Sequence, residues 1–310
     1  MDLFSPGCLG TCWYGDYHYM EPWVGCEHDC FYCYARFRTE VKDCLTEKAA
    51  AFEKPVLMLE PDLLLAEIHE KAVSGEVKTL KLSRFTDLFT PKFVREGLSQ
   101  EILKILARSK VERIIITTKG LPGEETLDLM ARHPALFSYN VAAKPQGKLS
   151  VEPNLFPLEE RLKAAAFVKK AGVLTTVHLD PVLVGIEDEK VSLDRFFAQL
   201  TRHGLDRVMF SYLLLNPLIL EHMEKKLGQE RMSSLTESYE GSPSLQYLPQ
   251  QAETVSIPPR ASLKEESVER ISHMLRERRF DFVLCSLKSA KDGHKVDRQL
   301  CPLCDGRFYA

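Results

Sequence analysis

The 310-residue chain has no apolar run that approaches the roughly 18 residues needed for a membrane-spanning helix. Residues 1–7 lack the basic segment and the apolar run of a secretory signal. The chain also has no internal repeat and no clustered run of Lys and Arg, and its formal net charge is −3. No global field therefore draws it to nucleic acid. These absences predict a cytoplasmic protein without a membrane partner and argue against tight binding to duplex DNA.

The composition is that of an ordinary globular protein, with 45% apolar and 27% charged residues. A chain of this length can bury a large core as one barrel-sized domain. Its nine cysteines are an odd number in a chain without a recognisable signal. We interpret them as metal ligands and free thiols of a reducing compartment rather than as disulfides.

Three of the cysteines lie close together, in the run GCEHDCFYCYAR at residues 25–36. Cys26, Cys30 and Cys33 have the spacing C-x3-C-x2-C, and three thiolates on one loop can hold three irons of a [4Fe–4S] cluster. The fourth iron is then open to a small molecule. The alternatives are a zinc site or three buried structural thiols. Zinc usually takes two cysteine pairs or a Cys/His mixture, and although His28 lies between the cysteines, no second pair follows closely.

This loop resembles that of the radical S-adenosylmethionine (SAM) superfamily, in its spore photoproduct lyase-like branch. The resemblance extends over residues 23–217 and includes FTD at 85–87, ITTK at 116–119 and DPVLVG at 180–185. It implies a cluster whose open iron chelates the methionine part of SAM, with Tyr32 near the adenine. It also implies a flavodoxin- or ferredoxin-type electron donor, reductive cleavage of SAM, and hydrogen abstraction by a 5′-deoxyadenosyl radical. Such a cluster is sensitive to oxygen.

Helix and strand patterns alternate along most of the chain, which predicts an α/β fold with right-handed parallel crossovers. Together with the resemblance, about six such units predict a partial (β/α)6 barrel of the TIM type with a C-terminal cysteine-containing extension. We divide the chain into an N-terminal extension (1–19), the partial barrel (20–228), a loop or linker (229–262) and the C-terminal extension (263–310). Strands are predicted at 20–24, 77–83, 111–118, 136–142, 173–179, 207–214 and 280–284, and helices at 61–73, 93–109, 124–132, 158–171, 193–203 and 263–279.

Functional residues of such barrels gather where the strands end, so the polar residues at predicted strand ends are the candidates for binding SAM. Thr86 and Asp87 offer a hydroxyl and a carboxylate that suit the amino group of SAM. Lys119 offers an ammonium group for its carboxylate. Thr86, Asp87 and Lys119 also match SAM-contacting segments of the lyase-like branch. The alternative for each is an ordinary polar loop residue.

Further candidates follow from the same rule. Ser138 and Asn140 are placed to reach the ribose hydroxyls of SAM, and Glu152 and Arg161 to contact SAM or the substrate. Solvated charges at a helix start are the alternative for Glu152 and Arg161.

The candidates for facing the substrate, and so for a catalytic role, come from two later strands. They are His178 and Asp180 at the end of the fifth predicted strand and Tyr212 near the end of the sixth. Packing is the alternative, because a lone histidine on a strand is more often a packing residue.

A second cysteine set, Cys285, Cys301 and Cys304, lies near the C-terminus with the spacing C-x15-C-x2-C. We predict an auxiliary iron–sulfur cluster or a zinc site, with a buried thiol and a flexible tail as the alternative. Candidates for a fourth ligand are Cys8, Cys12 and Cys44 and, for zinc, His294.

The resemblance does not include one feature of spore photoproduct lyase. That enzyme returns a hydrogen atom from a cysteine near the end of its second strand, whereas residues 83–87 of this chain read SRFTD. We therefore predict a different substrate, a small molecule or a peptide. A lyase-like enzyme acting on nucleic acid and a non-catalytic iron–sulfur or zinc protein are the alternatives.

Overall fold

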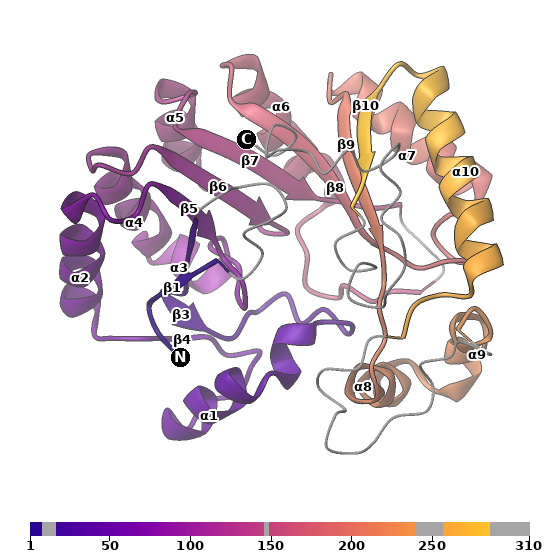
Figure 1. Cartoon of the computed structure of the whole chain (residues 1–310), viewed down its shortest axis with the longest axis horizontal. Coiled ribbons are helices and arrows are strands. Elements are labelled where there is room, and N and C mark those ends of the chain that lie inside the picture. Colours follow the sequence, from indigo (N-terminus) through magenta and orange to yellow (C-terminus); the bar gives the residue numbers. More distant parts are fainter. Residues whose placement is uncertain (8–16, 146–148, 240–256, 286–310) are drawn as a thin grey trace.

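A mostly parallel sheet forms the centre of the computed structural model, which describes residues 1–7, 17–145, 149–239 and 257–285 (Figure 1). Within this part of the chain the strand order is β1-β2-β5-β6-β7-β8-β9-β10. Only β1 runs antiparallel to its neighbour. The strands are β1 (Phe4–Pro6), β2 (His18–Met20), β5 (Thr79–Leu82), β6 (Arg113–Thr118), β7 (Phe137–Ala142), β8 (Leu174–Val182), β9 (Arg207–Tyr212) and β10 (Asp281–Leu284).

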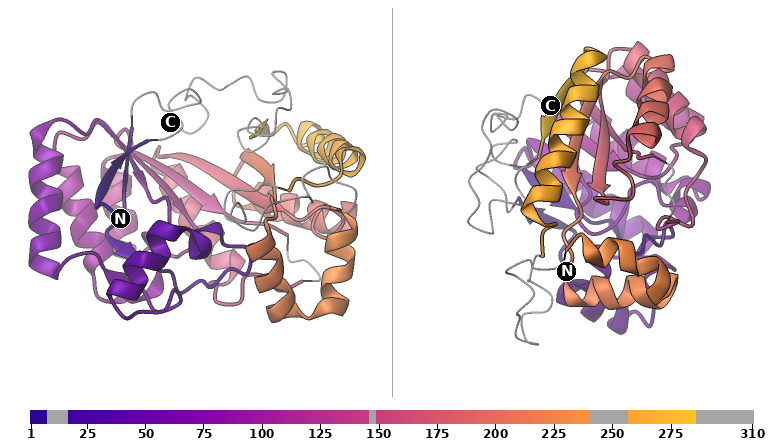
Figure 2. Two further views of the ribbon diagram at one scale, coloured as in Figure 1. Left: turned by 60° about the horizontal axis from the view of Figure 1, so that its bottom comes forward. Right: turned by 90° about the vertical axis from the view of Figure 1, so that its right-hand side faces the viewer.

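Helices cover the outer face of this curved sheet, and the views in Figures 1 and 2 agree on this. They are α2 (Pro61–Ser74), α4 (Leu98–Ala107), α5 (Glu124–Arg132), α6 (Leu158–Lys170), α7 (Lys190–Arg202) and α10 (Ala261–Glu277). The remaining elements are η1 (Tyr34–Phe37), α1 (Thr39–Glu47), α3 (Pro91–Arg95), α8 (Pro217–Leu227), α9 (Gln229–Glu237) and the small antiparallel pair β3 (Trp23–Val24) and β4 (Val56–Leu57). This architecture confirms the predicted α/β partial barrel.

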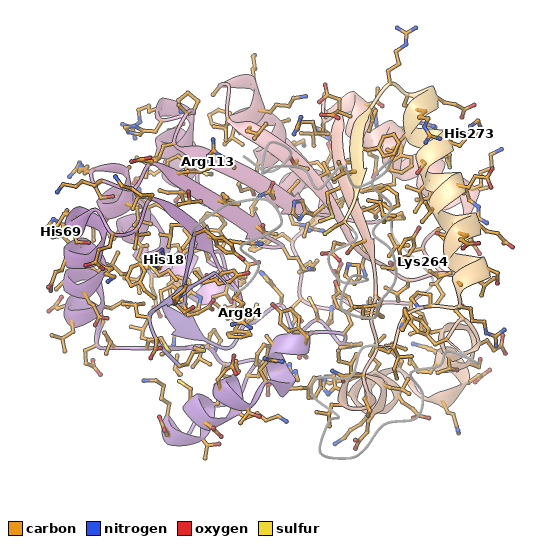
Figure 3. All side chains as sticks on the ribbon, viewed as in Figure 1. His18, His69, Arg84, Arg113, Lys264 and His273 are labelled. Atoms are coloured by element: carbon orange, nitrogen blue, oxygen red, sulfur yellow. The ribbon has the colours of Figure 1, made fainter. Side chains whose placement is uncertain are left out.

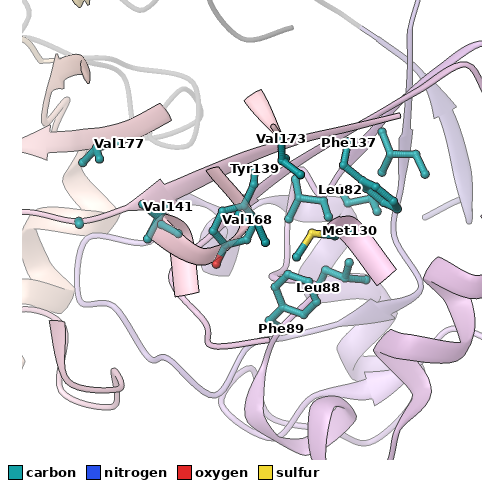
Figure 4. Close-up of a cluster of buried hydrophobic side chains, with 14 of the residues drawn as sticks. Leu82, Leu88, Phe89, Met130, Phe137, Tyr139, Val141, Val168, Val173 and Val177 are labelled. Atoms are coloured by element: carbon teal, nitrogen blue, oxygen red, sulfur yellow. The ribbon is translucent and has the colours of Figure 1, made fainter. Parts of the chain in front are cut away.

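The two faces of the sheet differ in chemistry because successive side chains of a strand point to opposite faces. The outer residues of each strand belong to the large apolar core that the helices complete (Figure 4). They include Leu82, Ile116, Tyr139, Val177 and Phe210. The alternate residues face the interior of the partial barrel, and many of them are polar: Lys81, Thr117, Ser138, Asn140, Thr176, His178 and Ser211. The polar candidates therefore share one face of the sheet.

Some predicted elements were wrong in detail. The predicted helix 93–109 is two helices, α3 and α4, because Gly97 has a φ of +75° and breaks the helical path. The predicted strand 20–24 is split between β2 and β3, which belong to different sheets. The predicted loop 229–262 begins with the helix α9. In the predicted C-terminal extension, β10 continues the main sheet by pairing with β9. None of the helices that the structure describes combines the length and the apolar character needed to cross a bilayer.

Candidate cluster and cofactor site

The three cysteines of the first set lie on the loop that follows β3. The N–H of Cys26 donates to the carbonyl of Phe52 at 2.7 Å, and the N–H of Cys33 donates to the carbonyl of Cys30 at 3.1 Å. Cys30 is buried, whereas Cys26 and Cys33 are partly exposed. The loop thus presents three thiols within eight residues, two of them partly exposed.

The chemistry of these thiols fits an iron–sulfur cluster. Burial raises the pKa of all three, to about 12 for Cys30, so each needs a nearby positive centre to ionise. Among the described residues, no three His, Cys, Asp or Glu side chains are close enough to hold a single metal ion. This spacing is compatible with a cluster, because each thiolate then binds a different iron at its own corner.

One side of this loop is fastened to the segment that follows β5. The hydroxyl of Thr86 donates to the carbonyl of Gly25 at 2.5 Å, and the N–H of Glu27 donates to Thr90 Oγ1 at 3.0 Å. Arg84 of the same segment lies beside the loop (Figure 3), and its carbonyl accepts a hydrogen bond from the Tyr34 hydroxyl at 2.5 Å. These contacts hold the cysteines against the end of β5.

Asp87 is the buried centre of this fastening. Its carboxylate accepts hydrogen bonds from Phe89 N at 2.9 Å, Thr118 Oγ1 at 2.6 Å and Lys119 N at 2.7 Å. His28, which lies between two of the cysteines, places its Nε2 3.2 Å from Asp87 Oδ2. Burial alone would raise the pKa of Asp87, but the interaction with His28 and the other hydrogen bonds lower it to about 2. One carboxylate therefore ties the cysteine loop to the strand end that carries Lys119.

The other side of the loop contacts the segment between β7 and α6. Phe31 N donates to the carbonyl of Val151 at 3.0 Å, and Asn154 Nδ2 donates to the carbonyl of Glu27 at 2.9 Å. The hydroxyl of Tyr32 donates to Glu152. The cysteine loop is thus held on one side by the segment after β5 and on the other side by the segment after β7.

Four charged side chains gather around Tyr32, of which Lys144 and Glu187 are buried and Lys119 and Glu152 are half-buried. Lys119 Nζ lies 4.0 Å from Glu152 Oε1, and Lys144 Nζ lies 3.8 Å from the same oxygen and 2.9 Å from Glu187 Oε1. Lys144 Nζ also lies 4.5 Å from the centre of the Tyr32 ring. Burial raises the pKa of the Glu187 carboxyl to about 7 despite Lys144, whereas Lys144 and Lys119 lower that of Glu152 against the effect of burial.

Sequence reasoning missed Lys144 and Glu187. Both follow strand ends, and Lys144 continues the inner-face alternation of Ser138 and Asn140. This alternation is the signal that points to Lys144.

The remaining SAM candidates lie on β7 and on the helix that follows it. Ser138 and Asn140 are buried on the inner face, and Asn140 Nδ2 donates to the carbonyl of Ile116 at 3.0 Å. Arg161 Nη1 donates to the carbonyl of Ala142 at 2.7 Å, so it braces the end of β7. Contact of any of these residues with SAM, including Thr86, Asp87, Lys119 and Tyr32, stays a prediction.

The substrate candidates divide between the two faces. His178 and Asp180 lie on the inner-face positions of β8, and Asp180 accepts a hydrogen bond from Ser211. Tyr212, in contrast, lies in the outer core, and its hydroxyl is 3.1 Å from Ser267 Oγ on α10. The alternation of β9 turns Ser211, and not Tyr212, inward, which favours the packing alternative for Tyr212. Contact of Tyr212, His178 or Asp180 with a substrate stays a prediction.

Of the second cysteine set, the described part of the chain contains Cys285, directly after β10. Its N–H donates to the carbonyl of Phe210 at 2.9 Å, so it continues the pairing with β9. Cys44, a proposed fourth ligand, is buried on α1 in the same apolar cluster as Cys26 and Cys33. The other residues of this prediction, Cys301, Cys304, Cys8, Cys12 and His294, lie outside the described residues.

Glu21, between β2 and the cysteine loop, gives the protein a pH-dependent stability. Burial raises the pKa of its carboxyl from 4.5 to about 8, although the N–H groups of Arg84 and Phe85 oppose this shift. The folded protein then keeps a proton that the unfolded chain loses at about pH 4.5, so stability falls as pH rises toward 8. We expect the free energy of unfolding to fall by on the order of 2 kcal/mol between pH 6 and 8.5.

In the Glu21→Gln variant, the free energy of unfolding should change markedly less between pH 6 and 8.5. Denaturant unfolding at both pH values measures it, and Glu70→Gln, an exposed position on α2, is the control that should behave like the wild type. An unchanged pH dependence in Glu21→Gln would assign the effect to other groups.

Comparison with known proteins identifies similarity in fold. No family model and no curated protein sequence matches the chain. Among solved structures, a spore photoproduct lyase double mutant with bound AdoMet and dinucleoside spore photoproduct is 16% identical, with a TM-score of 0.62. The match covers 86% of this chain and 75% of that chain. A second lyase mutant gives the same values, and the lyase complexed with dinucleoside spore photoproduct is 15% identical with a TM-score of 0.60 over the same shares. The chain therefore shares the partial-barrel fold of spore photoproduct lyase.

Proposed function

We propose that this chain is a radical SAM enzyme in which Cys26, Cys30 and Cys33 hold a [4Fe–4S] cluster. The observation that carries the proposal is the placement of these thiols on one loop that is clamped to the strand ends of the partial barrel. Three thiolates can each bind one iron of a [4Fe–4S] cluster and leave the fourth iron open to SAM.

When bound, the reduced cluster supplies the electron that cleaves SAM and so produces the radical that abstracts hydrogen from the substrate. The protein residues have simpler tasks. Lys119 offers an ammonium group to the carboxylate of SAM, and Tyr32 offers its ring and hydroxyl next to Cys30. Asn140 and Ser138 offer polar groups on the inner face of β7, and Thr86 and Asp87 hold the cysteine loop in place.

The substrate would lie over the inner face of the sheet, next to His178, Asp180 and Ser211. We favour a small molecule or a peptide. A lyase-like action on DNA is the second candidate, since the spore photoproduct lyase of similar fold binds a dinucleoside photoproduct. Against it stand the missing cysteine at residues 83–87 and the net charge of −3. A non-catalytic metal-binding role is the third candidate, and a flavodoxin- or ferredoxin-type protein is the proposed electron donor.

The test is to measure iron, sulfide and 5′-deoxyadenosine in protein that is purified and reconstituted without oxygen. We expect about four irons per chain if one cluster forms, and about eight if Cys285, Cys301 and Cys304 hold a second one. The variant Cys26→Ala/Cys30→Ala/Cys33→Ala should lose about four irons and all reductive cleavage of SAM. Cys44→Ala, which removes another buried thiol of the same apolar cluster, is the matched control and should keep the cleavage of SAM. A loss of iron in Cys44→Ala with SAM cleavage retained would assign Cys44 to the second cluster.

The outcomes separate the candidates. Wild-type protein without iron would overturn the proposal, and iron without SAM cleavage in the presence of a strong reductant would support the non-catalytic role. Stimulation of SAM cleavage by UV-irradiated DNA, but not by undamaged DNA, would favour the nucleic-acid candidate over the small-molecule one.

A further inference from the structure

The carboxylate of Glu152 lies among groups that are suited to hold a carboxylate from outside the protein. Two ammonium groups, of Lys119 and Lys144, face its Oε1 at 4.0 and 3.8 Å, and the Tyr32 hydroxyl donates to the same oxygen. All four side chains are buried or nearly so, with exposed fractions of 21% for Lys119, 7% for Lys144 and 12% for Glu152. Tyr32 lies between Cys30 and Cys33, so this position adjoins the cysteine loop.

The two glutamates of this group are held differently. Glu187 approaches Lys144 at 2.9 Å, is 1% exposed, and also accepts a hydrogen bond from Leu183 N at 3.1 Å. Glu152 stands at the outer limit of an ion pair from both lysines. Glu187 is therefore the fixed partner of Lys144, and Glu152 is the partner that can be replaced at low cost.

The surrounding backbone allows such a replacement without refolding. The carbonyl of Val151 accepts from Phe31 N, and the side chain of Asn154 donates to the carbonyl of Glu27, so the segment on either side of Glu152 is anchored. A change of rotamer at Glu152 alone would expose Lys119 Nζ, the Tyr32 hydroxyl and the side of Lys144 Nζ that faces away from Glu187. A third carboxylate cannot simply be added, because two cations would then face three buried anions.

We propose that Lys119, Lys144 and the Tyr32 hydroxyl form a carboxylate-binding site, that Glu152 occupies it as an internal competitor, and that an incoming carboxylate displaces the Glu152 side chain. The identification of this incoming carboxylate as the methionine carboxylate of SAM rests on the proposed function. A carboxylate of the substrate would be recognised by the same chemistry, and the experiment separates the two sources.

The experiment measures equilibrium binding of SAM and of decarboxylated SAM to the anaerobically reconstituted protein by calorimetry. Glu152→Gln should bind SAM about 5- to 10-fold more tightly than the wild type, because a neutral amide competes poorly for two ammonium groups. The affinity for decarboxylated SAM should stay within twofold. Lys144→Gln should weaken SAM binding at least tenfold and leave decarboxylated SAM nearly unchanged, with partial recovery in Lys144→Arg. Lys163→Gln, on the exposed face of α6, is the control.

A second measurement does not depend on SAM or on the cluster chemistry. Removing the internal carboxylate in Glu152→Ala should let acetate raise the thermal unfolding temperature of the protein, whereas acetate should leave the wild type unchanged.

The results then divide as follows. Weaker SAM binding in Glu152→Gln would make Glu152 a direct ligand of SAM and would overturn the proposal. The proposal would also be overturned if the substitutions changed the affinities for SAM and for decarboxylated SAM by the same factor. If the wild type binds no SAM, the proposed function fails, and stabilisation of Glu152→Ala by acetate would then indicate a site for a substrate carboxylate. No effect of acetate together with no SAM binding would overturn both.

Discussion

The Asp87→Asn variant should be less stable than the wild type by about 3 kcal/mol, because it removes a buried charge from a group of donors arranged around it. The carboxylate accepts from Phe89 N, Thr118 Oγ1 and Lys119 N, and His28 lies beside it. The Asn amide has only one acceptor oxygen, and its NH2 group would face at least one of these donors, which is unfavourable. Because His28 lies between Cys26 and Cys30, iron content after reconstitution should fall as well. Denaturant unfolding and iron analysis measure the two effects.

The control is Asp128→Asn on the exposed face of α5, which should stay within about 0.5 kcal/mol of the wild type and keep its iron. The sequence alone predicted Asp87 as a contact of SAM. If Asp87→Asn were as stable as the wild type and kept its iron but lost SAM binding, that prediction would hold and the fastening role described above would fail.

Periodicity and strand-end position were sufficient to predict most of the scaffold. Residues 61–73 were predicted as a helix and form α2 (Pro61–Ser74), and residues 136–142 were predicted as a strand and form β7 (Phe137–Ala142). Such segments are predictable because their apolar positions repeat with the period of the element that buries them. The break between α3 and α4 was missed because it depends on the positive φ of one glycine, Gly97, and not on a change of pattern.

The face of the sheet on which a candidate residue lies was harder to predict than its position at the end of a strand. Tyr212 and Ser211 are neighbours at the end of β9, yet the tyrosine bonds to α10 and the serine to Asp180. The alternation of β9 places Tyr212 on the same side as Val208 and Phe210, but which side of the strand faces the helices is decided by the packing of elements such as α10, which are distant in sequence. Likewise the ion pair of Lys144 with Glu187 joins residues that follow different strands, so it exists only once β7 and β8 are paired. The polar interior is thus a property of the assembled sheet.

The Gly25→Ala variant should be among the most damaging single-methyl changes in the chain. Gly25 has a φ of +90°, and a Cβ added there would lie 2.5 Å from the carbonyl oxygen of Phe52. That carbonyl cannot move freely, because it accepts the hydrogen bond from Cys26 N at 2.7 Å. The cost of the left-handed conformation and the displacement of the cysteine loop add, so we expect a loss of at least about 3 kcal/mol of stability. We also expect a large loss of iron on reconstitution.

The Gly204→Ala variant separates the cost of the left-handed conformation from the cost of displacing the cysteine loop. Gly204, after α7, has a φ of +66°, but a Cβ added there meets nothing within 4 Å. The Gly204→Ala variant should therefore lose only the roughly 1 kcal/mol that the left-handed conformation costs an alanine, and its iron content should stay unchanged. If Gly25→Ala lost no more stability than Gly204→Ala and bound iron normally, the contact with Phe52 would not constrain the loop. If it lost iron without losing stability, the position of Gly25 would matter for the geometry of the three thiols alone, and the fastening of this loop would be a requirement of the cluster rather than of the fold.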